Sequence, residues 1–337
     1  RLNIGLMISS LVIAFSLPFW LFLFSYAVLG PLHYLTEISW LRKKNFFTTG
    51  KYDFLPLVLV AIIWSGTYLF LSFFNDFPAE IKVSWFGNDW REVVGNFRIR
   101  MNHIVLAGLI GSVAMAFVSS WRKKIIALVG GFGIGVMFSY LDLEIYSHLI
   151  GTLLPTLIHV FLFTGIFMLY GALKSRSKSG LLGVLLFFVC GVLCFLVPTF
   201  SSTIDFDTGI NAYRNSSFHS LNAVVMNFNQ PMPWNIANDS LFNDLGIQLQ
   251  RFIAFAYTYH YLNWFSKTSI IGWHKISKIS LIVTALIWVL SVSLYVYDYT
   301  VGLKVLLFLS ILHVVLEFPL NAHSFVGVFR HLIRKDI

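Results

Sequence analysis

Charged side chains are scarce in this sequence of 337 residues, where they make up 12%, against 57% for hydrophobic residues. Water-soluble domains carry about 25% charged residues. The composition therefore excludes an ordinary soluble protein and predicts an all-α bundle of membrane-spanning helices. The formal net charge is +9. No basic patch interleaved with aromatic residues stands in a soluble region, so we attribute the excess to membrane orientation and expect no nucleic-acid partner.

Cysteine is nearly absent, and several catalytic motifs are missing. Cys190 and Cys194 fall four residues apart in one apolar run, which favours packing over a disulfide. The sequence has no G-x-S-x-G, P-loop, C-x-x-C or H-E-x-x-H motif, and it lacks the clustered histidine boxes of membrane desaturases. "GGFGIG" at 130–135 places Gly131 and Gly135 at a spacing typical of closely packed helices rather than of a phosphate loop.

Long apolar segments fill most of the chain, and about 20 such residues cross a bilayer. We predict about nine spans in a single integral membrane domain over 1–337. They cover 7–31, 53–74, 102–120, 125–141, 153–173, 181–199, 249–266, 279–297 and 301–318.

Every second connector between these segments is basic. Lys or Arg follows the first, third, fifth, seventh and ninth segments, at 42–51, 122–124, 174–178, 267–278 and 330–335. By the positive-inside rule, this alternation predicts the N-terminus outside and the C-terminus in the cytoplasm. The long 200–248 connector is then extracytoplasmic, and we expect it to pack over the outer face with short amphipathic pieces.

Histidines and carboxylates recur near the predicted cytoplasmic ends of three segments. His33 and Glu37 are four residues apart, as are His313 and Glu317, so each pair shares one helix face. His260 is expected at the same membrane depth. His274 and His323 also lie on this side, and each fits a ligand or a surface residue about equally well.

A second polar group is predicted toward the outer side. It consists of His148, with Asp142 and Glu144 just before it, and of His159 one to two turns into the fifth segment. For His103, His219 and His331, we expect either an interfacial position or a hydrogen bond to backbone.

Ionisable side chains inside a membrane are costly, and function is the first hypothesis for them. Imidazoles and carboxylates on facing helices are the ligands of iron, zinc or manganese. We therefore take His33, His260 and His313 as candidate metal ligands, with His148 and His159 as further candidates. Glu37 and Glu317 are candidate ligands or catalytic groups that orient an imidazole.

Three short windows around these residues resemble the Brp/Blh-type β-carotene dioxygenases. "GPLHYLTE" is similar to the G-x-P-H-G-x-x-D element of that family, "FIAFAYTYHYLNW" to its histidine-bearing helix, and "ILHVVLEFPLNAHS" to its last helix. Those proteins are bacterial and archaeal polytopic membrane enzymes that use non-haem iron.

The resemblance implies iron ligands at His33 and His260, with Glu37, His313 and Glu317 in support. The chain departs from the family at Tyr34, where the family has Gly, and in having one histidine in the second window instead of two. No "HFG" element is visible either, which leaves His103, His148 and His159 as alternatives for that ligand.

We therefore expect a metal-dependent oxidase or oxygenase, with non-haem iron or else zinc or manganese, in the bacterial inner membrane. Its substrate would be an apolar isoprenoid or lipid that arrives from the bilayer. Two alternatives stay open at this point. One is a proton-coupled transporter or channel whose His and Glu groups relay protons between the faces. The other is a non-catalytic membrane subunit that docks other membrane proteins through the 200–248 connector.

Overall fold

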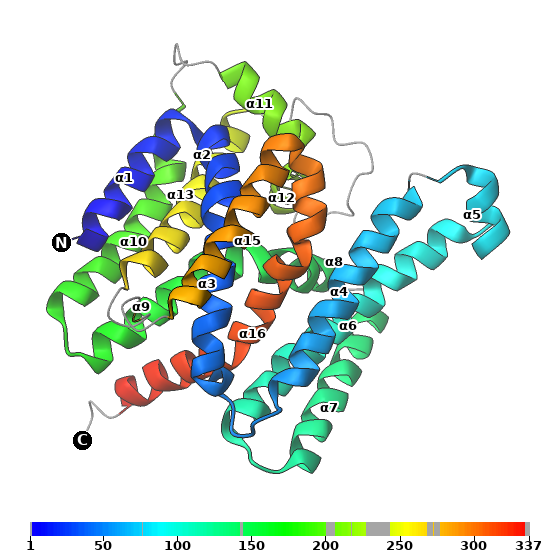
Figure 1. Ribbon diagram of the computed structural model, residues 1–337, viewed down its shortest axis with the longest axis horizontal. Coiled ribbons are helices and arrows are strands. Elements are labelled where there is room, and N and C mark those ends of the chain that lie inside the picture. Colours follow the sequence, from blue (N-terminus) through cyan, green and yellow to red (C-terminus); the bar gives the residue numbers. More distant parts are fainter. Residues whose placement is uncertain are drawn as a thin grey trace.

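The structure is a computed structural model, and it describes residues 2–75, 77–141, 144–199, 206–216, 218–226, 243–267, 272 and 277–333. Over these residues the chain forms helices and turns, without strands (Figure 1). Eight of the described helices are long and apolar enough to cross a membrane. They are Pro18–Lys43, Phe54–Phe74, Trp90–Phe117, Trp121–Tyr140, Ile145–Lys174, Lys178–Leu196, Lys278–Tyr297 and Tyr299–Ile333. The all-α class and a helical bundle suited to a membrane agree with the sequence prediction.

The first predicted span, 7–31, is wrong as a single helix. Helix α1 (Leu2–Ser16) ends before Leu17, whose φ of −139° and ψ of 57° are not helical, and α2 (Pro18–Phe24) begins at a proline. The chain turns back there and continues through η1 (Ser25–Leu29) into α3 (Gly30–Lys43) (Figure 1). The assignment of the N-terminus to the outside remains a prediction. The alternation of basic connectors no longer supports it, because the first predicted span consists of two helices that run in opposite directions.

Helix α13 (Asp244–Ser266) contains the predicted segment 249–266, yet it is not among the eight apolar helices. It packs against α1, α2, η1, η3, α3 and α10, and most of its residues are buried. A helix enclosed by other helices does not need a lipid-like surface. Its tyrosines and polar residues therefore lie in the centre of the bundle, which is where the site is built.

Helix α16 (Tyr299–Ile333) is the second central helix, and it is longer than the predicted segment 301–318. It passes through Pro319 without ending, although proline removes a helical hydrogen bond. It packs against α3, α4, α6, α9 and α15 (Figure 1). His313 and Glu317 therefore lie inside this helix and not at its inner end.

Helices α4 (Phe54–Asn75), α6 (Trp90–Phe117) and α7 (Trp121–Tyr140) form antiparallel neighbours on one side of α16, with α5 (Ala79–Phe86) at their tip (Figure 1). A Cβ at Gly131 would lie 2.9 Å from Ala107 Cα, and one at Gly135 would lie 2.9 Å from His103 Cα. Only glycine allows this approach of α7 to α6, which confirms the predicted close packing.

The remaining helices complete the bundle. They are η2 (Asn45–Phe47), α8 (Glu144–His148), η3 (Leu149–Phe163), α9 (Thr164–Lys174), α10 (Lys178–Leu196) and α15 (Lys278–Tyr297). Within the 200–248 connector, α11 (Phe206–Asn215) packs on α2, and α12 (His219–Met226) packs on α13 and η3. Short helices therefore cover this end of the bundle in the described part of that connector, and the assignment of this end to the outer face remains a prediction. Cys190 and Cys194 are buried free thiols on α10.

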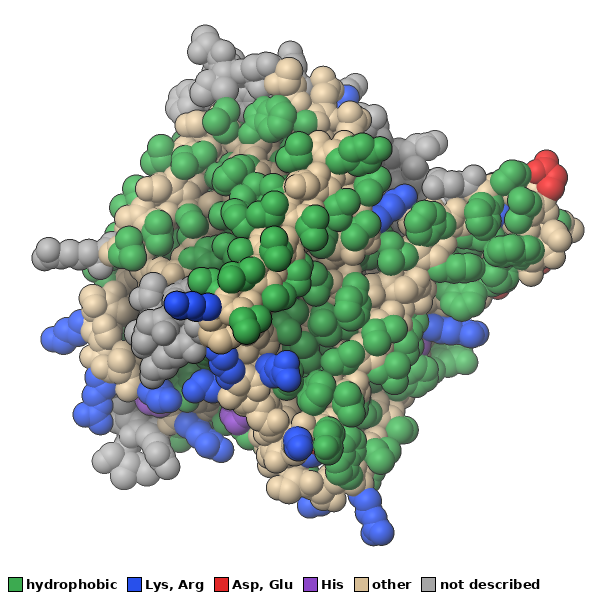
Figure 2. Space-filling model, in the orientation of Figure 1, with side chains coloured by type: hydrophobic (Ala, Val, Ile, Leu, Met, Phe, Trp, Pro, Cys, Tyr) green, Lys and Arg blue, Asp and Glu red, His purple; other side chains and the backbone are tan. Residues whose placement is uncertain are grey.

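The surface carries the pattern of a membrane protein. Figure 2 shows apolar side chains over the middle of the visible face, with most Lys and Arg toward its lower edge. α3 ends on that side with Arg42 and Lys43 in its last turn (Figure 1). Together with the eight apolar helices, this distribution supports an integral membrane protein.

Candidate metal centre

Four histidines from four separate segments meet in the interior of the bundle. His33 is on α3, His159 on η3, His260 on α13 and His313 on α16. One nitrogen of each ring lies within 4.8 Å of the corresponding nitrogen of the other three. All four side chains are buried, with exposed fractions of 1%, 1%, 7% and 3%. The sequence predicted three of them together, whereas His159 had been assigned to the outer group.

The ring nitrogens face one another in two pairs. Nε2 of His260 lies 3.0 Å from Nε2 of His33, and Nε2 of His313 lies 3.2 Å from Nε2 of His159. Metal–imidazole bonds of about 2.0–2.1 Å place neighbouring ligand nitrogens about 2.8–3.0 Å apart in square geometry and about 3.3–3.4 Å apart in tetrahedral geometry. The two separations of 3.0 and 3.2 Å lie in this overall range, and they are also compatible with N–H···N hydrogen bonds.

Two π-helical segments turn these histidines toward each other. The segment η1 leads directly into α3 and its His33, and η3 contains His159 one turn after Pro155. A π-helical turn holds an extra residue, so it rotates the side chains that follow around the helix axis; such turns are frequent at functional sites. This rotation is a tertiary feature that helical periodicity in the sequence does not announce.

The two predicted carboxylates flank the histidines. Oε2 of Glu37 lies 3.0 Å from Nε2 of His33, and Oε2 of Glu317 lies 3.0 Å from Nδ1 of His159. Each contact has the distance of an ion pair, but neither oxygen makes a well-aligned hydrogen bond. Glu317 thus supports a histidine on another helix, rather than His313 four residues before it.

Several buried polar atoms at this centre have no hydrogen-bond partner. They are Nδ1 of His33, His159 and His313, together with Oε2 of Glu37 and Glu317. Such atoms are expensive to bury. A metal ion held by the facing Nε2 atoms would not satisfy these Nδ1 atoms, so the fit to a metal rests on the Nε2 atoms. Four neutral imidazoles with adjoining carboxylates are a donor set for iron, zinc or manganese. The residues therefore fit a metal ion.

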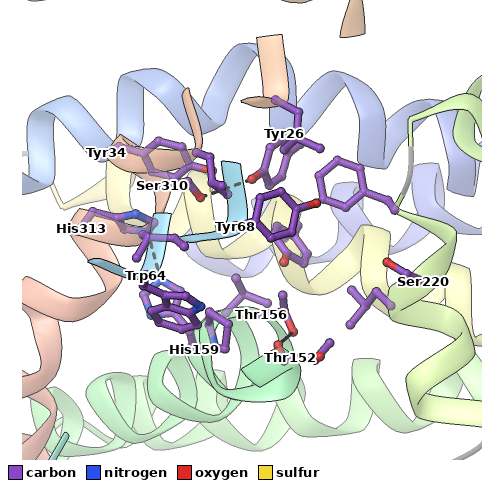
Figure 3. Close-up of a pocket in the computed structure, with 18 of the residues that line it drawn as sticks. Tyr26, Tyr34, Trp64, Tyr68, Thr152, Thr156, His159, Ser220, Ser310 and His313 are labelled. Carbon is purple, nitrogen blue, oxygen red and sulfur yellow. Dashed lines mark hydrogen bonds between the residues drawn. The ribbon is translucent and has the colours of Figure 1, made fainter. Parts of the chain in front are cut away.

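An aromatic cavity of about 220 Å³ reaches this centre from one side. Its wall includes His159 and His313 and five tyrosines, namely Tyr26, Tyr34, Tyr68, Tyr257 and Tyr261. In Figure 3 the two histidines lie toward one end, with Ser220 toward the other. Hydroxyl groups interrupt the apolar wall, because Tyr26 Oη contacts Ser310 Oγ at 3.2 Å and Tyr34 Oη contacts Tyr261 Oη at 3.1 Å. The space suits an apolar molecule that carries a few polar atoms.

A second cavity, of about 30 Å³, touches the other two histidines, His33 and His260. We call it the small polar cavity because Glu37, Glu317, Asn263 and Lys267 line it, although apolar side chains such as Phe167 and Leu320 also form its wall. Burial lowers the pKa of the Lys267 ammonium group, which lies just beyond the end of α13. The two cavities share no lining residue, so the histidine cluster separates an aromatic space from a small polar one.

The other histidines in the described chain lie apart from the cluster. His148 is buried at the end of α8, eleven residues before His159, and it is not one of the four grouped histidines. Its candidacy as a ligand therefore finds no support in the structure.

His103 contacts Tyr146 Oη at 3.2 Å, and His323 contacts the Phe47 carbonyl at 3.1 Å. His331 bonds to the Gly327 carbonyl, as expected for a histidine bonded to backbone, while His274 lies outside the described residues.

Several residues of the site gave no signal in the sequence. Thr164 Oγ1 lies 2.7 Å from Nδ1 of His260, and the ring of Tyr34 stacks on His313 at a centroid distance of 4.2 Å. Threonine and tyrosine are common in membrane helices, so only the fold identifies these two. Tyr34 stands where the resembling family has glycine, and here its ring forms part of the wall beside His313.

Replacing Thr164 with valine should weaken metal binding by about 10–100-fold, because the partner that orients a ligating imidazole is lost. The hydroxyl accepts a hydrogen bond from Nδ1 of His260 when Nε2 of that ring binds a metal. Competition with a chelator would measure the affinity. Thr258→Val is the matched control, since Thr258 lies on the same helix as His260 but contacts Ser25 Oγ at 2.8 Å. Equal affinities in the two variants would contradict the prediction.

No protein-family model, curated protein or solved structure shows significant similarity to this chain.

Proposed function

We propose that this protein is a membrane-embedded, metal-dependent oxidase or oxygenase with a non-haem iron centre, and that its substrate is an apolar isoprenoid or other lipid. The observation that carries the proposal is the buried four-histidine cluster at the end of an aromatic cavity. An iron held by His33, His159, His260 and His313 would supply the activation of dioxygen. The choice of isoprenoid rests on the resemblance to β-carotene dioxygenases.

The protein's own residues have three tasks in this proposal. The imidazoles hold the ion, while Thr164 and Glu317 keep two of the rings in position through His260 and His159. The tyrosines and Trp64 exclude water and hold the apolar substrate beside His159 and His313. Tyr34, stacked on His313, limits how closely a substrate can approach that ring.

Membrane orientation forms part of the same proposal. We place the basic ends of α3 and α16 in the cytoplasm of a bacterial inner membrane, since Lys and Arg favour that side. A substrate that dissolves in lipid could then reach the aromatic cavity from within the bilayer. The relay alternative relied on two polar groups at opposite faces. His159 now belongs to the central cluster, and so the described helices offer that alternative no specific support.

Replacing His260 with alanine should remove the bound metal. We expect stoichiometric iron, zinc or manganese in the purified wild-type protein and a background level in the variant, measured by elemental analysis. His103→Ala is the matched control, because His103 is also buried but lies outside the cluster. Absence of metal from the wild type, or retention of metal in His260→Ala, would contradict the proposed metal centre.

Dioxygen uptake separates an oxygenase from other metal proteins. The iron-loaded protein in nanodiscs should consume dioxygen when an apolar isoprenoid is added, and His260→Ala should not. The contrary outcome is a protein that binds metal yet takes up no dioxygen with any isoprenoid or lipid of a panel. That result would be consistent with the metal centre and would refute the oxygenase reaction.

A further inference from the structure

The centre holds more metal-binding atoms than one ion requires. Four imidazole nitrogens are enough ligands for one four-coordinate divalent ion. Glu37 and Glu317 add carboxylate oxygens beside the same histidines. The surplus consists of oxygen atoms, all on one side of the cluster.

These oxygens face the small polar cavity. Oε2 of Glu37, Oε2 of Glu317 and Oδ1 of Asn263 are buried, and none has a hydrogen-bond partner. All three residues line the cavity of about 30 Å³, and Asn263 is only 4% exposed. A carboxylate that is buried without a partner must be protonated or must bind a cation. A site that gathers two of them with an amide oxygen suits a cation.

Among the described side chains, only the imidazoles of His33 and His159 contact these carboxylates, and a ring that binds the first ion is neutral and does not supply a cation. Lys267 lines the same cavity, but no ion pair joins it to Glu37 or Glu317 among the described salt bridges. Asn263 Oδ1 would remain without a donor in any case. The cavity has room for one water-sized species and therefore for a metal ion.

We propose that the polar cavity binds a second divalent cation, of the oxygen-preferring Mn²⁺ or Fe²⁺ class, through Glu37, Glu317 and Asn263. This proposal rests on the proposed function to the extent that a first ion occupies the four histidines. Carboxylates between two ions are the usual arrangement of two-metal sites, whose ions stand about 3.5–4 Å apart. Bundles that hold two iron ions likewise collect Glu and His from four helices.

The arrangement also gives the two carboxylates a shared task. Glu37 is four residues after His33, and Glu317 is four residues after His313, so two helices each deliver one nitrogen and one oxygen donor. The oxygen atoms lie next to ligand rings of the first ion, at 3.0 Å from His33 Nε2 and from His159 Nδ1. A second ion there would be close to the first, with the aromatic cavity left open on the histidine side.

Titration of the metal-free protein with Mn²⁺, followed by electron paramagnetic resonance and elemental analysis, tests this inference. We expect two Mn²⁺ per chain with a spin-coupled signal. In Asn263→Val, which touches none of the four histidines' hydrogen bonds, the second binding step should weaken at least tenfold and the first should stay unchanged. Asn102→Val is the matched control, since Asn102 is a buried asparagine on α6.

The possible stoichiometries have different meanings. One Mn²⁺ per chain in the wild type would overturn the second site and leave the four-histidine centre intact. No bound Mn²⁺, zinc or iron would overturn both proposals. Two ions whose binding is unchanged in Asn263→Val would place the second ion elsewhere and refute the site described here. If Asn263→Val does not fold, the wild-type stoichiometry and the spin coupling decide alone.

Discussion

Replacing His159 with alanine should abolish metal binding as completely as replacing His260. The ring nitrogens of His159 lie 3.2 Å from His313 Nε2 and 3.0 Å from Glu317 Oε2, and the side chain is 1% exposed. Losing this residue removes one candidate ligand and leaves the Glu317 carboxylate without its contact to an imidazole. We expect the affinity to fall by more than the roughly 10–100-fold that loss of an outer partner costs. Metal content and chelator competition measure the effect.

His148→Ala is the decisive comparison for this experiment. The sequence places His148 and His159 in one outer group, whereas the structure places only His159 in the cluster. We expect His148→Ala to keep its metal. If His148→Ala loses metal while His159→Ala retains it, the central cluster is not the binding site.

Replacing Asp53 with asparagine should reduce stability by about 3–5 kcal/mol, because it breaks a buried ion pair and leaves the Lys124 ammonium without its partner. Lys124 Nζ donates to Asp53 Oδ2 at 2.6 Å, with exposed fractions of 1% and 0%. The same oxygen accepts from the Gly50 amide at 2.7 Å. These bonds connect the turn before α4 to the first turn of α7, so we expect the α4–α6–α7 group to loosen first.

A double replacement separates the charge effect from a general packing loss. Asp53→Leu combined with Lys124→Met leaves no unpaired charge, and it should recover part of the loss caused by Asp53→Asn. Lys123→Met is the control, since Lys123 is the exposed neighbour of Lys124 on α7. Unfolding in mixed detergent, followed by tryptophan fluorescence, measures each variant. A loss below about 1 kcal/mol in Asp53→Asn would show that the pair behaves like a surface salt bridge.

The local spacing of the polar residues predicted much of the candidate site. His33 and Glu37, like His313 and Glu317, lie on one face of a helix because a helical turn holds 3.6 residues. His260 was expected at the same depth, and it does meet His33. The sequence could not show that Glu317 would contact His159 instead of His313, because that choice depends on how α16 packs against η3.

His159, a further candidate ligand, was placed in the outer group because the start of its helix was misjudged. Hydropathy placed the segment at 153–173, which left His159 near one end, but the apolar helix runs over Ile145–Lys174 and His159 is near its middle. The π-helical turns of η3 then direct the ring inward. Neither feature follows from the apolar pattern, since residues that flank a span tolerate polar side chains.

The sequence by itself determined the class of this protein, an all-α chain with long apolar helices, because transfer of each segment into lipid depends on its own composition. It also determined the histidine–carboxylate pairs within single helices, since helical spacing is local. The tertiary structure alone decided that α1 turns back at Leu17, that the less apolar α13 is the enclosed central helix, and that four histidines meet between two cavities. Those outcomes depend on contacts between segments far apart in the chain, where the packing of one helix determines which face of another is buried.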